Sequence, residues 1–581
     1  MQPALRTSQR RRPAWLSAAG AVSFTLALYT APAQAAWLEL CPGAPSPEAH
    51  LLSQMMQADG TLLSATVREM PSGRDCPRIA IEAPLRDVLG LYPLPAATAA
   101  DLAPHFSLSV RQEGRRLLIS DIELGKVRAT TPSADPLPLA INLLPRLRAS
   151  VFGAENRATV EAHGGQLTLQ CRAGLLPAGL RLGGPAQPPR ARSRLQLTGD
   201  SKGQFVLLSS NGLQTFKEDA LPLGVLAPLL AMPTQTWEFD NGVLGPSWRH
   251  WTIACPLARG ELTLQSLQLL PSSGPTPGRA TWTWQSKDWQ QTPDAVLQRA
   301  RRYGAKTLFI TVPVADGAVL EPERLQVFVQ RASAQRVSVW AVDGDPAMVL
   351  PAEHNSAAAR ARAYAVFNRQ APSMARLQGV QFDVEPYLLQ GHAWSDAEMD
   401  DYYLALVRSL HQSLQDHVGP QQAAIQLEMV VPFWWAARST LLANLAPSLS
   451  GLVVMDYRTN PENIYRFAVP FLDWGETHGR NVRIALEAGP ISPENRQRYE
   501  QADSGVLWPL QIGGRHFLLM LQRPLPNPQG VSFRLASSYV LDGNATTFHH
   551  DMTGLLKQLP TLEAKFSAWP HFTGMALHEL P

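Results

Sequence analysis

Between residues 280 and 581, short apolar runs alternate with stretches of helical periodicity, and this alternation restricts the fold of the 581-residue chain more than any other feature. Apolar runs of this length are typical of parallel strands that are buried on both faces by helices. The predicted strands are 281–285, 307–312, 337–342, 379–385, 425–431, 451–457, 482–487 and 573–579, and the predicted helices between them include 293–303, 321–335, 356–370, 395–417 and 461–479. Eight such units predict an α/β fold, a (β/α)8 (TIM) barrel over 280–581, with a doubly wound open sheet as the alternative.

The last unit of this region is irregular, because residues 500–545 contain a hairpin pattern (507–512 and 515–521 around Gly513-Gly514) before the final strand.

The chain before residue 270 has a different sequence pattern. Residues 36–270 consist of short alternating runs and turn residues, with hairpin patterns at 105–124 and 157–171, which predict an N-terminal β-sandwich-like region. A Gly/Pro-rich stretch at 183–192 is a candidate break between two modules, and 271–279 is a candidate linker to the barrel.

The N-terminus has the three parts of a secretory signal peptide. A basic segment containing Arg6, Arg10, Arg11 and Arg12 precedes an apolar run at 14–31 and a small-residue site, Ala33-Gln34-Ala35. Cleavage near Ala35 predicts a periplasmic or secreted protein, with an uncleaved membrane anchor as the alternative. The formal net charge of +3 would fall by these four arginines to −1, which argues against nucleic acid as the partner.

The four cysteines, Cys41, Cys76, Cys171 and Cys255, suit an oxidising compartment. Four cysteines allow three pairings, and proximity along the chain favours Cys41–Cys76 and Cys171–Cys255. A zinc site is the competing interpretation, but the spacings are wide and no Cys-x-x-Cys occurs. We expect structural disulfides, no metal and no cofactor.

Acidic side chains recur where the predicted barrel strands end. In the fourth strand Gln381, Asp383 and Glu385 share one face, because alternate residues of a strand point the same way. Further polar residues toward the ends of later strands are Glu428, Asp456, Tyr457, Glu487 and His578. Active sites of barrels of this kind lie at the carboxyl ends of the strands. The structural alternative is that these acids pair with Arg458, Arg483 or backbone amides.

Aromatic residues near the same strand ends suggest a sugar ligand, since the apolar faces of pyranose rings stack on aromatic rings. Candidate contacts are Trp284 on the first strand, Tyr387 after the fourth, and Trp434 with Trp435 after the fifth. Packing inside the barrel is the alternative, and for Trp282, Trp284 and Trp340 the two interpretations are equally supported.

The segment 378–385, Gln-Gly-Val-Gln-Phe-Asp-Val-Glu, resembles the fourth-strand signature of the family 18 (chitinase-like) glycoside hydrolases. The resemblance implies that Glu385 is a proton donor and that Asp383 orients the substrate's N-acetyl group. Gln378 and Gln381 stand where that signature has further acids. Strand six reads Met455-Asp456-Tyr457 where the family has Met-x-Tyr-Asp.

A second resemblance is to the clan A retaining glycosidases, which carry Asn-Glu-Pro after strand four and a Glu at strand seven. Glu385-Pro386 and Glu487-Ala488-Gly489 match these places, with Val384 where the Asn would be. This resemblance implies that Glu385 is the acid/base and Glu487 the nucleophile. The run Phe-Asp-Val-Glu-Pro-Tyr (382–387) is also similar to uncharacterised bacterial barrel proteins.

The sequence therefore predicts an exported glycoside hydrolase-like protein that acts on a polysaccharide or oligosaccharide. Asp456 and Tyr457 would stabilise charge at the anomeric carbon. Two alternatives remain. One is a non-catalytic glycan-binding or envelope scaffold with a degenerate barrel, and the other is a divalent-metal site built from Asp383, Glu385 and His578. The oligomeric state is not predicted.

Overall fold

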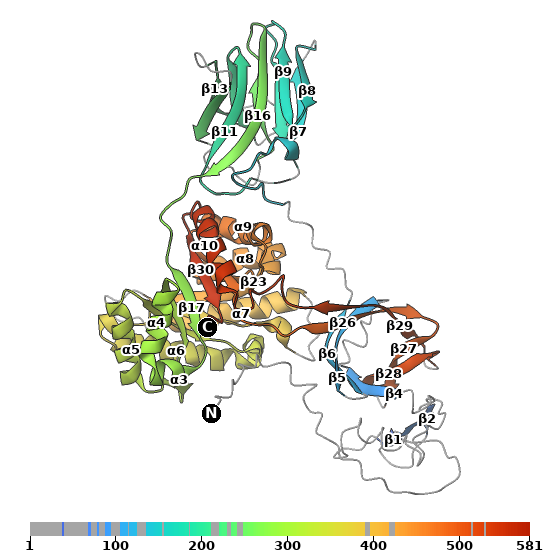
Figure 1. Cartoon of the computed structure of the whole chain (residues 1–581). Coiled ribbons are helices and arrows are strands. Elements are labelled where there is room, and N and C mark those ends of the chain that lie inside the picture. Colours follow the sequence, from blue (N-terminus) through green and yellow to red (C-terminus); the bar gives the residue numbers. More distant parts are fainter. Residues whose placement is uncertain are drawn as a thin grey trace. The chain divides into compact units, whose positions relative to one another are not determined.

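A computed structural model describes most of the chain after residue 134 (Figure 1). The described part is 135–581, apart from 154–155, 185, 187, 211–219, 229–233, 241–247, 390–395, 417–423, 513–514 and 528–529. Before residue 135 it describes only the backbone of six strands: β1 (Leu38–Glu39), β2 (Arg68–Met70), β3 (Arg78–Ala80), β4 (Val88–Leu94), β5 (His105–Glu113) and β6 (Arg116–Leu124). The predicted signal peptide, Cys41 and Cys76 lie outside the described residues.

The C-terminal region contains a closed barrel of eight parallel strands, which confirms the predicted barrel. In barrel order the strands are β17 (Arg279–Thr283), β18 (Ala305–Thr311), β21 (Ser338–Asp343), β22 (Gly379–Phe382), β23 (Gln426–Pro432), β24 (Gly451–Met455), β25 (Asn481–Glu487) and β30 (Phe572–His578). The helices that connect them are α3 (Ser286–Gln291), α4 (Pro293–Arg302), α5 (Pro322–Ala334), α6 (His354–Gln370), α7 (Asp396–Gln415), α8 (Ser439–Leu445), α9 (Pro461–His478) and α10 (Met552–Phe566). The parallel pairing of β25 with β30 and of β30 with β17 closes the barrel, which excludes an open sheet.

Local signals in the sequence set the helix ends. Before α9, the Asn460 side chain accepts hydrogen bonds from the backbone N–H groups of Glu462 and Asn463, and Pro461 occupies the first helical position. After His478, Gly479 adopts the left-handed conformation (φ 62°) that ends a helix. Among the described residues, no helix is both long and apolar enough to cross a membrane.

Residues 148–271 form a β-sandwich of two five-stranded antiparallel sheets (Figure 1). One sheet has the order β13 (Ala220–Leu226), β12 (Phe205–Ser210), β15 (His250–Ala254), β10 (Ala178–Gly183), β7 (Arg148–Gly153). The other has the order β14 (Gln235–Asp240), β11 (Ser193–Lys202), β16 (Gly260–Pro271), β9 (Gln166–Cys171), β8 (Ala158–His163). β10 and β11 belong to different sheets, so the stretch 184–192 connects the two layers of one sandwich.

The Cys171–Cys255 disulfide is present, as predicted, with its Cα atoms 5.8 Å apart. Cys171 ends β9 in one sheet and Cys255 follows β15 in the other. The bond therefore links the two layers of the sandwich. Such a link is favoured in an oxidising compartment and constrains the unfolded chain.

A seven-stranded sheet joins two parts of the chain that are far apart in sequence. Its order is β4, β28 (Arg515–Leu525), β27 (Gly505–Ile512), β29 (Ser532–Leu541), β26 (Glu494–Ala502), β5, β6. The β27–β28 hairpin and the β5–β6 hairpin are present as predicted. The pairing of β5 with β26 was not predicted. Residues 1–129, 385–399 and 491–544 form one compact unit, and the sandwich and barrel belong to the other.

A buried carboxyl group joins the sandwich to the barrel. Asp473 on α9 accepts hydrogen bonds from the Arg190 backbone N–H at 2.7 Å and from Trp569 Nε1 at 2.8 Å. Burial raises the pKa of Asp473 from 3.8 to about 6, although both donors act in the opposite direction. Nearby, the Tyr465 hydroxyl donates to the Leu137 carbonyl at 3.0 Å. The junction is thus hydrogen-bonded at several buried points.

We expect mild acid to strengthen the protein through Asp473. A raised folded-state pKa adds stability that is complete below the unfolded value of 3.8 and is lost as the pH rises through about 6. Between pH 5 and 7, the unfolding free energy of the wild type should fall by about 1.3 kcal/mol relative to Asp473→Asn, which keeps an acceptor oxygen but cannot titrate. Denaturant unfolding of both proteins across this range measures the difference, and a pH-independent difference would contradict the prediction.

Candidate active site

The barrel interior holds aromatic and polar side chains that contact each other between different strands. Trp282 on β17 donates from Nε1 to Gln381 Oε1 on β22 at 2.7 Å. The Trp282 ring stacks on Phe309 of β18, with centroids 5.2 Å apart, and Phe309 meets Trp340 edge-on at 5.9 Å. All four side chains are buried. Packing, rather than ligand contact, is therefore the role of Trp282 and Trp340.

Glu428, a predicted substrate contact, forms a buried ion pair inside the barrel instead. Its Oε1 lies 3.3 Å from Arg483 Nε, and Arg483 Nη1 also donates to the Thr573 carbonyl at 2.8 Å. The two side chains are 1% and 9% exposed. Burial raises the pKa of Glu428 above its ordinary value, and Arg483 opposes this shift. For this acid the structural alternative holds, because its partner on β25 faces the same interior.

At the carboxyl end of the barrel, Glu487, His578 and Trp284 form a hydrogen-bonded chain. Glu487 and His578 are the last residues of β25 and β30 and lie opposite each other in register. His578 Nδ1 is 2.9 Å from Glu487 Oε2, and Trp284 Nε1 is 2.7 Å from His578 Nε2. The Gly489 backbone N–H donates to Glu487 Oε1 at 2.9 Å. Donors therefore hold both carboxylate oxygens in fixed positions.

These contacts determine where the proton of His578 lies. An indole N–H can only donate, so His578 Nε2 accepts from Trp284 and carries no proton. The proton is then on Nδ1 and is donated to Glu487. Trp284 is 36% exposed, whereas Glu487 is 2% exposed. The chain thus leads from an accessible aromatic ring to a buried carboxylate.

Asp456 and Tyr457 follow β24 at the same end of the barrel. Asp456 is fully buried, and within the described residues neither of its carboxylate oxygens has a hydrogen-bond partner. Burial raises the pKa of Asp456 well above 3.8, while the charge of Arg458 acts in the opposite direction. The Tyr457 ring stacks near His578, with centroids 6.0 Å apart. Tyr457 therefore lies beside the hydrogen-bonded chain formed by Trp284, His578 and Glu487.

Asp383 and Glu385 lie in the segment that follows β22. The Asp383 backbone N–H donates to the Asp343 carbonyl at 2.8 Å. Glu385 precedes a short 3-10 helix, Pro386–Leu388, and its Oε1 accepts a hydrogen bond from the Tyr387 hydroxyl. Glu385 and Tyr387 belong to the compact unit of the seven-stranded sheet, whereas Asp383 belongs to the barrel unit. The catalytic roles of Glu385 and Asp383, and the ligand contact of Tyr387, stay predictions.

The two tryptophans after β23 differ in exposure. Trp435 is 2% exposed and packs edge-on against Tyr403 at 4.9 Å, with the Arg438 guanidinium over its ring at 5.6 Å. This burial corrects the expectation that Trp435 contacts a ligand. Trp434 is partly exposed and meets Phe433 edge-on at 5.2 Å, so it stays a candidate contact.

Asp343 was not predicted as a site residue, and Arg458 was predicted only as a pairing partner for an acid. Asp343, the last residue of β21, accepts from Arg360 Nε at 2.6 Å and from the Tyr364 hydroxyl at 2.7 Å. The polar turn Asp343-Gly344 after an apolar run was the available signal. Arg458 places its guanidinium over Phe433 at 4.3 Å, a contact that no sequence spacing indicated. Within the described ranges, no group of three or more His, Cys, Asp or Glu side chains could hold a metal ion.

No family model and no curated protein matches the sequence. Similar solved structures include a GH18 chitinase from Cycas revoluta in complex with (GlcNAc)3, 11% identical over 52% of this chain and 94% of that chain, with a TM-score of 0.29. Bacteroides uniformis beta-glucuronidase 2 is 13% identical over 74% of this chain and 45% of that chain, with a TM-score of 0.32. A CBM29-2 carbohydrate-binding module covers 22% of this chain and 82% of that chain at 11% identity, with a TM-score of 0.17. At these scores the assignment of a function depends on the site itself.

The Glu428–Arg483 pair gives a test of the barrel interior. Arg483→Met should destabilise the protein by about 3–5 kcal/mol, because it leaves a buried acid without its partner. The loss should be smaller at pH 5 than at pH 8, since an unpaired Glu428 takes up a proton more readily. The double variant Glu428→Leu/Arg483→Met should lose less than the single variant. Denaturant unfolding compares them, and a double variant at least as unstable as the single one would refute the interpretation.

The tautomer of His578 is directly measurable. In a protein with 15N-labelled histidine, the ring nitrogens of His578 should show the Nδ1–H form at pH 7.5, with the signal assigned by its loss in His578→Asn. Trp284→Phe removes the indole donor to Nε2 but not the Glu487 acceptor, so the Nε2 resonance should shift while the Nδ1–H form persists. An unchanged Nε2 resonance in Trp284→Phe would mean that the indole does not bind this nitrogen.

Proposed function

We propose that this protein is an exported glycoside hydrolase that cleaves a polysaccharide or oligosaccharide at the carboxyl end of its barrel. The observation that carries the proposal is the chain Trp284–His578–Glu487, in which an accessible ring is connected to a carboxylate held by two N–H donors. This end of a (β/α)8 barrel is where catalytic groups lie in enzymes of this fold. The Cys171–Cys255 disulfide supports export.

Glu487 is proposed as the nucleophile. His578 Nδ1–H and the Gly489 N–H each bind one of its oxygens, and such charge-assisted hydrogen bonds hold a carboxylate in one orientation. In the reaction, an oxygen of Glu487 would attack the anomeric carbon while the glycosidic C–O bond breaks. Trp284, Trp434 and Tyr387 are proposed to stack on sugar rings, and Tyr457 to lie beside the reacting sugar.

Glu385 is proposed as the acid/base. It would give its proton to the departing glycosidic oxygen, and then take a proton from the water that hydrolyses the glycosyl ester on Glu487. Its support is its place in the chain, three residues after the end of β22, together with the resemblance of 378–387 to known signatures. The retaining mechanism requires the two carboxyl groups to be about 5–5.5 Å apart, and an inverting one about 6.5–9.5 Å. The chitinase-like alternative gives the second role to Asp383 and an N-acetyl group of the substrate.

A non-catalytic glycan-binding function is the second candidate. It is favoured by the hydrogen bonds that already engage both oxygens of Glu487 and by the Tyr387 hydroxyl on Glu385. In that case the exposed face of Trp284 would still stack on a sugar, but no bond would be broken. Both candidate functions predict glycan binding, but only the first predicts turnover of the glycan.

Glu385→Gln and Glu487→Gln should each lower the rate of hydrolysis by at least about 100-fold, because each removes a group that transfers a proton or forms a bond. Binding of the same glycan should persist in both. The measurements are reducing-end release and calorimetric binding on N-acetylglucosamine oligomers, xylan and uronate-containing polysaccharides. Glu353→Gln, at an exposed site in the unit that contains Glu487, is the matched control. Full activity in either active-site variant would exclude its assigned role, and binding without turnover by the wild type would favour the second candidate.

A further inference from the structure

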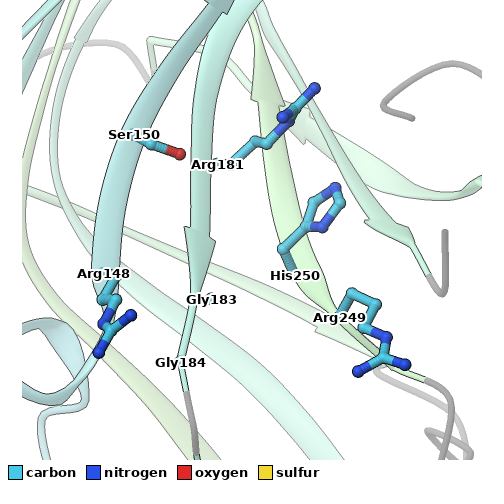
Figure 2. Close-up of a pocket in the computed structure, with 7 residues that line it drawn as sticks. All are labelled: Arg148, Ser150, Arg181, Gly183, Gly184, Arg249 and His250. Carbon is cyan, nitrogen blue, oxygen red and sulfur yellow. The ribbon is translucent and has the colours of Figure 1, made fainter. Parts of the chain in front are cut away.

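A basic cleft lies on the outer face of the sandwich sheet β13–β12–β15–β10–β7. Its volume is about 300 Å³, and Figure 2 shows the side chains around it. They are Arg148 and Ser150 from β7, Arg181 from β10, and Arg249 and His250 at the start of β15. Along β10, Leu180 and Leu182 are buried in the core, so Arg181 and Gly183 point to the opposite face. The cleft is therefore on the side of this sheet that faces away from the other layer.

The hollow depends on Gly183. In register, Gly183 lies between Arg148 on one neighbouring strand and His250 on the other. It has no side chain, so its backbone forms the floor between the two longer residues. A Cβ atom at this position would lie 2.7 Å from the Arg249 carbonyl oxygen and would begin to fill the hollow. The sequence thus leaves an open space that three arginines line.

The lining of the cleft carries positive charge. The lining residues include no Asp or Glu. Arg148 and Arg249 are exposed, and neither forms an ion pair with another described residue. On the other sheet, by contrast, Arg194 pairs with Glu238 at 2.7 Å and Lys202 with Glu261 at 2.8 Å.

A structural arginine in the same sandwich looks different. Arg157 is 4% exposed, and its guanidinium donates to the carbonyls of Arg172, Leu176 and Pro256. Arg148 and Arg249 have no such role in packing. Grouping arginines around one hollow raises the local positive potential, and a cleft lined by one sign of charge concentrates that potential.

We propose that this cleft binds an anionic glycan, a sugar chain whose units carry carboxylate or sulfate groups. Guanidinium groups recognise such oxyanions through paired hydrogen bonds. The volume is at the lower end of the range for small-ligand sites, which suits a short stretch of a polymer. That the anion is a sugar chain rests on the proposed function, whereas the negative charge of the ligand is inferred from the cleft alone. The sandwich then holds the polymer by its charge, separately from any chemistry at the barrel.

The test measures binding by the full-length mature protein at 50 and 150 mM NaCl. The probes are two pairs with matched backbones: polygalacturonate against its methyl-esterified form, and dextran sulfate against dextran. The expected result is binding of one or both charged members, weaker at the higher salt concentration. Arg148→Ala/Arg249→Ala should raise the dissociation constant at least tenfold. Ser150→Trp, which changes no charge, should also weaken binding by obstructing the hollow.

Arg172→Ala/Arg259→Ala is the control, because it removes two exposed arginines from the same sandwich outside the cleft. It should change the dissociation constant less than twofold. The preferred charged probe identifies the acidic group. Equal weakening by both double variants, equal binding of the neutral partners, or tighter binding of a DNA fragment or of anionic lipid vesicles through Arg148 and Arg249 would overturn the proposal. Repeating the binding in Glu385→Gln separates the two hypotheses, since loss of turnover there leaves binding at the cleft intact.

Discussion

The barrel depends on a charged pair in its interior. Arg483 on β25 binds Glu428 on β23 and also the Thr573 carbonyl on β30, so one guanidinium connects three strands. A buried ion pair adds little net stability, but the loss of one partner is costly, because the remaining charge has no water around it. The Arg483–Thr573 contact adds a side-chain link to the backbone pairing of β25 with β30, at the point where the register of that pairing shifts. Further along the same two strands, that alignment places Glu487 opposite His578.

Much of the barrel could be predicted because its information is local. Each strand is an apolar run of the right length, and some helices carry start and stop signals, such as Asn460-Pro461 and Gly479 around α9. The seven-stranded sheet could not be predicted. Its β5–β26 pairing joins residues near 110 to residues near 495, and alternation within a strand says nothing about which distant strand it pairs with.

In the candidate site, too, local sequence signals predicted where a residue lies but not what it contacts. Strand-end position predicted that Glu487, Asp456 and His578 lie at one end of the barrel, because strand ends in a parallel barrel share an edge. It did not distinguish an acid at the rim from Glu428, which lies deeper and pairs with Arg483. A position just after a strand also favoured Trp435 as a ligand contact, yet its ring packs on Tyr403. Which partner satisfies a polar or aromatic group is decided by tertiary contacts that a single strand does not encode.

The way in which charges are satisfied separates structural residues from functional candidates in this molecule. Glu428 and Asp343 have arginine partners, so their cost is offset inside the fold. Asp456 is fully buried without a hydrogen-bond partner among the described residues, and burial raises its pKa well above 3.8. A buried carboxyl group without such a partner is costly to the fold. Fold stability alone would favour an apolar side chain at that position, so Asp456, unlike Glu428 and Asp343, stays a functional candidate.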